Sequence, residues 1–425
     1  MYSLYLHIPF CTHRCAYCDF NTYAGQEDMI PAYVEALTQE INFVGERLKD
    51  HEAKRLGDYS TKAHTIFFGG GTPSLLSPPQ FDSIFKSLRA AFTLTPDCET
   101  TIEANPGTVS YENLLKLREI GINRISYGVQ SANAFELRML ERAHNFFDVI
   151  EAVTSARKAG FDNLNLDLIY GLPEQTLDSW QTTVTRILDL RPEHISAYAL
   201  TLEHGTPFGR WASKGLLPLP DPDLAAEMYE WLGETLETSG YVQYEISNWA
   251  KEVEGQRSKV AATLDPRPLT PAHACQHNLQ YWRSLPYLAF GAGAHGYANG
   301  YRYSNVLRIK TYIERMTNSP IPQSLVFPLS PATVNQHKQS AGDDMSEYMI
   351  NNLRLVQAGV AEADFRSRFG RGLKEVYGTE INELVRVGLL EETDSPLPVG
   401  EGLGVRVRLT RRGRLLGNQV FVRFV

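Results

Sequence analysis

The chain has 425 residues, of which 43% are hydrophobic and 21% are charged, and its formal net charge is −8. This is the composition of a soluble globular protein, and the acidic balance argues against broad binding of nucleic acid or anionic membranes. The sequence has no uninterrupted apolar run of about 18 residues, so it predicts no membrane span.

Strand-like runs alternate with amphipathic helical runs through the first half of the chain. This alternation predicts an α/β fold of βαβ units around a parallel sheet, and six such units indicate an open, partial (β/α)6 barrel. The predicted strands cover residues 3–8, 64–68, 99–104, 124–129, 163–169 and 194–199, and the predicted helices cover 29–48, 79–92, 111–120, 147–159 and 177–188.

Several chemically informative residues fall near the ends of these strands or just after them. They are Cys11, Gly69, Glu103, Gln130 and Asp167. In parallel α/β folds the functional residues gather at the carboxyl ends of the strands. We therefore expect these residues to share one site.

Three cysteines follow the first predicted strand in a C-x3-C-x2-C spacing, at Cys11, Cys15 and Cys18. Thiolates this close together favour an iron–sulfur cluster, zinc or Cu(I). A [4Fe–4S] cluster needs four ligands, so three local cysteines would leave one iron open. Zinc would need a fourth ligand such as His13, whose place inside the loop would strain a closed site. A thioredoxin-like Cys15-x-x-Cys18 pair would leave Cys11 unexplained.

The C-x3-C-x-aromatic-C run after a short strand resembles the signature of the radical S-adenosylmethionine (SAM) superfamily. The flanking runs YLHIPFC, GGGTP, GVQS and DLIYGLP narrow the resemblance. Together they resemble the oxygen-independent coproporphyrinogen III oxidase group, and in particular its HemW heme-chaperone branch. The likeness extends over nearly the whole chain.

This resemblance implies a [4Fe–4S] cluster on Cys11, Cys15 and Cys18, with SAM on the open iron. An arginine suits the carboxylate of SAM, and an aspartate suits a ribose diol or an amine. A plain tight turn at the glycines and an ordinary salt bridge at Glu103 are the alternatives. The positions that match SAM contacts of the group are Tyr5, Tyr17, Gly70, Gly71, Thr72, Glu103, Gln130, Arg142 and Asp167.

Up to residue 330, the chain divides into a core barrel of residues 1–250, a polar segment 251–274 and a barrel extension 275–330. Segment 251–274 contains prolines and has no sustained period, so we interpret it as a flexible insertion. The extension carries H-N-x-x-Y-W from His277 to Trp282, a run associated with heme in the chaperone branch. An imidazole can ligate heme iron, so His277 is a candidate heme ligand. The alternative is a core histidine.

Residues 291–296 fit G-x-G-x-x-G, a weak sign of dinucleotide binding when no Rossmann context surrounds it. We interpret this run as a close-packed turn at the barrel rim, with His295 as an unassigned candidate ligand.

Residues 331–425 are expected to form a small winged-helix-like α+β domain. Helical patterns over 345–357 and 373–387 precede two short strands that flank a Gly- and Pro-rich tip at 395–404. Arginines such as Arg406 and Arg408 could suggest nucleic acid. Acidic neighbours and the acidic chain favour a solvated face or a protein contact instead.

Two functions remain, a heme chaperone and a coproporphyrinogen III oxidase. The oxidases continue the cysteine motif with a further cysteine where this chain has Phe20, and they carry a longer N-terminal extension. Both departures, with the H-N-x-x-Y-W run, favour a carrier without oxidase activity. The expected partners are heme and heme-accepting proteins, including membrane-associated respiratory ones, while a homodimer stays open. The clustered cysteines, and a start without a secretion signal, favour the cytoplasm.

Overall fold

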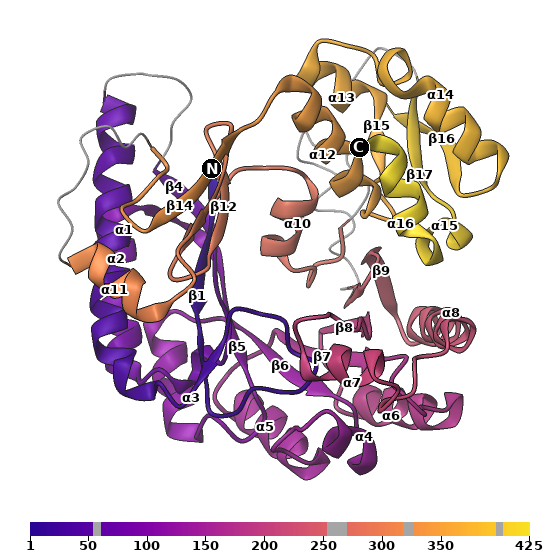
Figure 1. The fold of residues 1–425 in the computed structure, drawn as a ribbon. Coiled ribbons are helices and arrows are strands. Elements are labelled where there is room, and N and C mark those ends of the chain that lie inside the picture. The colour runs from indigo at the N-terminus through magenta and orange to yellow at the C-terminus, as the bar shows by residue number, and fades with distance from the viewer. Residues whose placement is uncertain (54–60, 253–269, 318–326, 397–402) are drawn as a thin grey trace. The chain divides into compact units, whose positions relative to one another are not determined.

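A computed structural model describes residues 1–53, 61–252, 270–317, 327–396 and 403–425 (Figure 1). The chain forms two compact units. The first contains Met1–Met228 and Pro286–Lys338, and the second contains Tyr229–Leu285 and Gln339–Val425. The boundaries that we gave for the four predicted segments stay predictions, and most of segment 251–274 lies outside the described residues.

The first unit is built on a parallel sheet whose central strands follow in the order β1-β4-β5-β6-β7-β8. Each neighbouring pair is parallel, which confirms the partial (β/α)6 barrel. The strands are rich in fully buried residues on both faces, as expected when helices cover a parallel sheet. Their bounds are β1 Tyr2–Ile8, β4 Lys62–Gly70, β5 Thr93–Ala104, β6 Arg124–Gln130, β7 Leu164–Tyr170 and β8 His194–Ala199.

On the other side of β1 the sheet continues through a strand from much later in the chain. Strand β11 pairs with β1 in parallel, and β12, β13 and β14 extend the sheet in antiparallel fashion. The short strands β2 and β3 form a separate parallel pair. The bounds are β2 Phe10–Cys11, β3 Tyr23–Ala24, β11 Tyr287–Phe290, β12 His295–Ala298, β13 Tyr301–Asn305 and β14 Thr333–Lys338.

Helices flank the strands of this unit, and α1 packs against both α2 and α11 (Figure 1). Several begin at side-chain caps, including Ser110 before α3 and Thr176 before α6, which satisfy otherwise unpaired amide groups. The bounds are η1 Glu27–Met29, α1 Ile30–Ala53, η2 Pro73–Leu75, α2 Pro78–Ala91, α3 Tyr111–Ile120, α4 Ala134–Met139, α5 Phe146–Lys158, α6 Leu177–Asp189, α7 Pro207–Ser213 and α11 Ile309–Thr317. Helix α8, Pro222–Thr238, contains the boundary to the second unit.

The second unit contains a hairpin, a short helix and a C-terminal domain. Strands β9 Tyr241–Glu245 and β10 Asn248–Lys251 pair in antiparallel fashion, and α10 spans Gln276–Trp282. The C-terminal helices pack on a three-stranded sheet of order β15-β17-β16, which confirms the winged-helix-like domain. Its elements are α12 Ala341–Leu353, β15 Val360–Ala361, α13 Glu362–Phe369, α14 Leu373–Arg386, β16 Leu390–Pro396, β17 Leu403–Leu409, α15 Arg411–Leu415, α16 Gly417–Phe421 and η3 Val422–Phe424.

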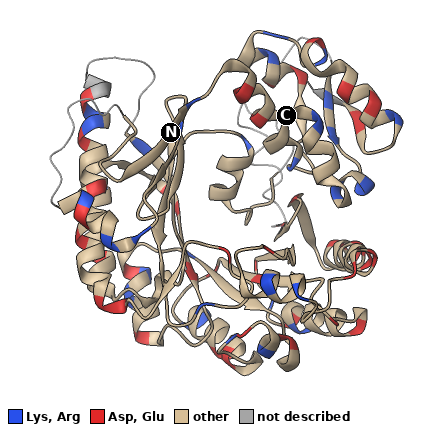
Figure 2. Cartoon of the chain, viewed as in Figure 1, with Lys and Arg blue, Asp and Glu red and all other residues tan. Residues whose placement is uncertain are grey.

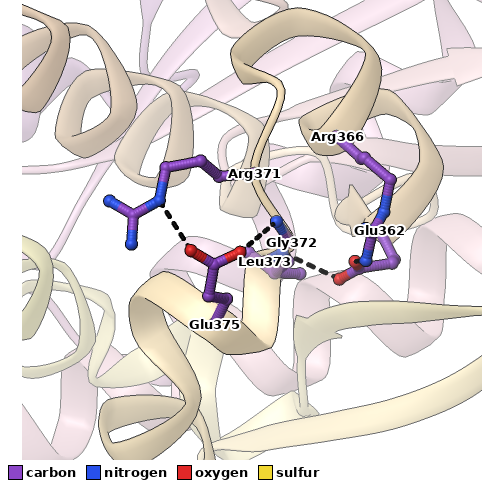
Figure 3. A network of polar contacts seen from close by, with 6 residues as sticks. All are labelled: Glu362, Arg366, Arg371, Gly372, Leu373 and Glu375. Atoms are coloured by element: carbon purple, nitrogen blue, oxygen red, sulfur yellow. Dashed lines mark hydrogen bonds and ion pairs between the residues drawn. The ribbon is translucent and has the colours of Figure 1, made fainter.

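Two carboxylates fix the turn between α13 and α14 in this domain (Figure 3). Glu375 accepts the amide of Gly372 at 3.2 Å, and Glu362 accepts the amide of Leu373 at 2.9 Å. Arg371 and Arg366 hold the same two carboxylates. The first amide groups of α14 are therefore capped from both helices, which fixes where this helix begins.

Acidic and basic residues are mixed along the outer helices, whereas the charged residues of α8 are all acidic (Figure 2). In the C-terminal domain, Arg408 pairs with Glu391 at 2.6 Å. Arg406 donates to the carbonyl oxygen of Ala358. Both arginines are therefore engaged within the domain. Among the described residues, no helix is long and apolar enough to cross a membrane.

Candidate functional site

A pocket of about 540 Å³ opens at the carboxyl ends of the parallel strands of the first unit. A volume of this size suits a small-molecule or cofactor site. The candidate residues of the sequence analysis line this pocket, with four exceptions: Tyr5, Gly69, His277 and His295. The expectation that the strand ends share one site is met by Cys11, Glu103, Gln130 and Asp167, but not by Gly69.

The three cysteines lie on the loop that begins at β2. Cys11 is the last residue of β2, and the amide of Cys18 donates to the carbonyl oxygen of Cys15 at 3.1 Å, which closes a turn between them. Thr72 Oγ1 donates to Cys11 Sγ at 3.5 Å. Burial raises the pKa of the Cys11 and Cys18 thiols, because it penalises the thiolate form.

The donors at this pocket fit an iron–sulfur cluster. All three thiols face the same pocket, and sulfur is the ligand type that such clusters require. Among the described residues, no three His, Cys, Asp or Glu side chains are arranged closely enough to hold one metal ion, so the three thiols would have to draw together around a bound cluster.

The glycine loop after β4 is shaped by close backbone contacts. A Cβ on Gly70, whose φ is +108°, would lie 2.4 Å from the His7 ring. A Cβ on Gly71 would lie 2.5 Å from the carbonyl oxygen of Phe10. The amide groups of Gly71 and Thr72 donate to the carbonyl oxygens of Ile8 and Phe10. These two amides are thus engaged within the protein.

Glu103 lies near the end of β5 and accepts the amide of Gly70 at 3.0 Å. Burial, with a smaller contribution from the nearby Asp167 carboxylate, raises the pKa of Glu103 to about 8. Without a bound cation, the Glu103 carboxyl is therefore largely protonated at neutral pH. A cationic group brought into the pocket would favour its ionised form.

Arg142 connects two of the cysteines through a chain of hydrogen bonds. Its guanidinium donates to Cys15 Sγ at 3.5 Å, to the carbonyl oxygen of Gly128 at 2.7 Å and to Asn105 Oδ1. Asn105 Nδ2 donates in turn to Thr72 Oγ1 at 3.1 Å, and Thr72 reaches Cys11. One arginine thus fixes the cysteine loop to the ends of two strands.

Asp167 and Gln130 complete the polar wall of the pocket. Asp167 accepts Ser126 Oγ at 2.7 Å and Asn165 Nδ2 at 2.8 Å. Burial raises the pKa of Asp167, although these hydrogen bonds act in the opposite direction. Gln130 has a φ of +67°, and the register between β6 and β7 shifts between Gly128 and Gln130. A left-handed residue that is not glycine is strained, and such strain is often found at functional sites.

Two predicted cofactor contacts lie elsewhere, and the candidate ligand His295 is exposed at the start of β12. Tyr5 is partly buried, its hydroxyl donates to His7 Nδ1 at 3.0 Å, and its ring stacks on Phe67. His277 belongs to the second unit, on α10, where it is 1% exposed. Its Nε2 is hydrogen-bonded to the hydroxyl of Tyr281 at 2.7 Å. The roles of both residues stay predictions.

Sequence reasoning missed three residues that hold the pocket together, namely Asn105, Ser126 and Asn165. Ser126 and Asn165 are buried polar residues within parallel strands, where long apolar runs are usual. A polar side chain inside such a run is the signal that could have found them. Asn105 directly follows β5 and precedes a proline, which marks it only as a loop residue.

Comparisons with known proteins agree with this geometry. The radical SAM superfamily matches residues 5–187, and the HemN C-terminal domain matches residues 339–416. The heme chaperone HemW of Bacillus subtilis is 36% identical, over 100% of this chain and 99% of that protein. The heme chaperone HemW of Escherichia coli is 34% identical, over 92% of each chain.

A solved structure shows the same fold. Coproporphyrinogen III oxidase (HemN) from Escherichia coli, described as a radical SAM enzyme, superposes with a TM-score of 0.74. The superposition covers 99% of this chain and 89% of that chain, at 23% sequence identity. At this identity the likeness concerns the fold.

Proposed function

Because this chain belongs to the family of the heme chaperone HemW, we propose that it binds heme and transfers it to acceptor proteins. The pocket of the first unit holds a [4Fe–4S] cluster and SAM. The observation that carries the proposal is the convergence of Cys11, Cys15 and Cys18 with the predicted SAM contacts in one pocket. A cluster with three cysteine ligands leaves one iron open for SAM and supplies an electron when reduced.

Each residue of the pocket has a role that follows from its position. Cys11, Cys15 and Cys18 ligate the cluster, and Arg142 orients Cys15 through its hydrogen bond to the sulfur. The Glu103 carboxylate accepts a hydrogen bond from the ammonium group of SAM, and this positive charge favours the ionised form of Glu103. Asp167, held by two donors, faces a ribose diol or an amine.

Further contacts to SAM come from Tyr17, Gly70, Gly71, Thr72 and Gln130, which all line the pocket. Tyr5 supports them from behind through His7, whose ring packs against Gly70.

His277 is the proposed heme ligand, and the structure sets a condition on this role. An imidazole that is 1% exposed and bonded through Nε2 to Tyr281 has to leave that bond before Nε2 can reach an iron. Heme binding at this segment therefore requires a rearrangement around α10. The flanking Tyr281 and Trp282 offer flat rings to a porphyrin.

The alternative is a coproporphyrinogen III oxidase that uses SAM for oxidative decarboxylation. One observation is compatible with it, because the predicted SAM contacts other than Tyr5 line the pocket and would serve that chemistry equally well. Against it, Phe20 occupies the position of the further cysteine of the oxidases. Its ring is 64% exposed and lines the same pocket.

The acceptors are proposed to be heme-accepting proteins, including membrane-associated respiratory ones, and a homodimer stays a possibility to be measured. A cytoplasmic location is part of the same proposal. The three clustered cysteines, which have no partners spaced for disulfides, support a reducing compartment.

One experiment separates the carrier from the oxidase. The purified protein is reconstituted anaerobically, and heme titration and coproporphyrinogen III turnover are measured on the same sample. We expect a saturable Soret shift and no protoporphyrinogen. Robust turnover would establish the oxidase, and the absence of heme binding would rule out the carrier.

A further inference from the structure

The turn between β11 and β12, residues 291–294, packs against Asn21, which lies just beyond the cysteine loop. Gly291 and Gly293 have φ values of +101° and +77°. A Cβ on Gly293 would lie 2.3 Å from Asn21 Nδ2, and a Cβ on Gly291 would lie 2.5 Å from Tyr33 Oη. The G-x-G-x-x-G run therefore needs its first two glycines for close packing, as expected for a turn rather than a dinucleotide site.

One side of this turn is held by a buried carboxylate on helix α1. Glu40 is 1% exposed and accepts four hydrogen bonds from neutral donors. The donors are the amide of Gly291 at 2.8 Å, Asn305 Nδ2 at 2.7 Å, Tyr312 Oη at 2.6 Å and Ser330 Oγ at 2.6 Å. A carboxylate in this environment fixes four separate segments at one point.

The other side of the turn holds the end of the cysteine loop. Asn21 Nδ2 donates to the carbonyl oxygens of Ala292 at 3.2 Å and Leu307 at 3.0 Å. Tyr33 joins the two sides, because its hydroxyl accepts the amide of Ala292 and donates to the carbonyl oxygen of His7. Asn21 lies only three residues beyond Cys18.

We propose that Glu40 and Asn21 are positioning residues for the cluster, acting through the 291–294 turn. The carboxylate fixes the turn, the turn fixes Asn21, and Asn21 fixes the carboxyl-terminal side of the loop that carries Cys15 and Cys18. The inference rests on the proposed function, since it assumes that the three cysteines hold a cluster. It adds a support beyond Cys18 in the chain, whereas the Arg142 chain reaches Cys15 and Cys11.

The role of Asn21 differs from that of a core residue. Its side chain is only partly buried, and its amide donors meet two carbonyl oxygens of neighbouring turns. Shortening it removes little apolar contact, so the fold should tolerate the change. The loop would instead lose its hydrogen-bonded anchor.

The test uses the full chain with Asn21→Ala and Glu40→Gln, reconstituted anaerobically. Release of the cluster to an iron chelator is followed by visible absorption, and the unfolding midpoint is measured in parallel. We expect Asn21→Ala to unfold like the wild type but to release the cluster about tenfold faster, the order expected for losing hydrogen bonds that hold a site. Glu40→Gln should change release in the same direction.

Asn299→Ala is the matched control, because Asn299 Nδ2 also donates to a backbone carbonyl oxygen, that of Phe327, at a neighbouring turn. It should release the cluster at the wild-type rate. Wild-type release from Asn21→Ala would overturn the inference, even if Glu40→Gln failed to fold. If the wild type itself takes up no cluster, the proposed function fails first, and this inference falls with it.

Discussion

The cluster pocket of the first unit and the His277 segment of the second unit differ in how ready they are to bind. In the pocket, side chains from several strand ends already face one space, and hydrogen bonds from Arg142 and Thr72 reach two of the sulfurs. In the other segment, His277 is buried and its Nε2 is bonded to Tyr281. The first site already gathers its side chains around one pocket, whereas the second has to open. A carrier has to retain its cluster and SAM, which suits a site whose side chains are already gathered. It also has to take up and release heme, which suits a segment that opens.

The largest expected effect breaks the first site outright. Cys18→Ala should abolish the broad iron–sulfur absorption and the EPR signal after reconstitution, because two thiolates cannot hold the cluster. Cys98→Ala is the control and should keep the signal, since Cys98 does not line the pocket. A full signal from the Cys18 variant would disprove the ligand assignment.

The next effect removes a charge but leaves the cluster ligands in place. Glu103→Gln should weaken SAM binding by about a hundredfold, the order expected when one member of a buried charge pair is lost. Isothermal titration on the reconstituted protein measures this. Glu136→Gln removes a buried carboxylate that instead accepts Ser131 and Ser179, and it should bind SAM normally. Equal affinities in all three proteins would exclude Glu103 as the ammonium contact.

The pKa of Glu103 also predicts how SAM binding depends on pH. Because burial and the nearby Asp167 raise the pKa to about 8, the carboxyl is mostly protonated at pH 7, and Arg124 only partly offsets this. SAM affinity should rise about tenfold from pH 7 to above pH 8 as the carboxylate forms. Because the pKa of Glu103 is higher in the folded protein than in the unfolded chain, protonation of this carboxyl favours the folded state. This contribution to the free energy of unfolding, in the absence of SAM, is fully present below the pKa of the unfolded chain and is lost as the pH rises through 8. Glu103→Gln should remove both trends, and a pH-independent wild type would contradict the assignment.

The smallest expected effect sharpens the comparison at the second site. Tyr281→Phe keeps the ring but removes the hydroxyl bonded to His277, so heme affinity should increase about three- to fivefold, the order of one hydrogen bond. His277→Ala should lower affinity and alter the Soret band, whereas His337→Ala, on β14, should do neither. If the Tyr281 and His277 variants titrate like the wild type, heme binds elsewhere.

Much of the barrel could be predicted because its elements carry strong local signals. Strand β8 and helix α3 have the predicted bounds, and α3 begins after the cap Ser110 and ends at Gly121, which has a φ of +122°. Strand β5 begins earlier than predicted, at Thr93. Its first residues are partly exposed and include a proline, so they lack the apolar pattern of a core strand.

The candidate pocket residues could be predicted because motif and strand end coincide, but the contacts between them could not. The Asn105 bridge between Arg142 and Thr72 depends on three loops meeting in space. The pairing of β1 with β11 likewise joins residues far apart in sequence. The hydrophobic periodicity of either strand predicts a strand but not its neighbour in the sheet. Local patterns define elements, while long-range packing decides which polar groups meet.

The anchoring of the cysteine loop by late segments has a consequence for biosynthesis. Asn21 and its partner Leu307 are separated by 286 positions. At the usual pace of translation, roughly 5–20 residues per second, the ribosome needs on the order of 15–60 seconds to cover that distance. During this interval β1 lacks its neighbour β11, and the cysteines have left the exit tunnel without the turn that packs on Asn21. The nascent chain therefore presents its three clustered thiols well before the turn that packs on Asn21 has been synthesised.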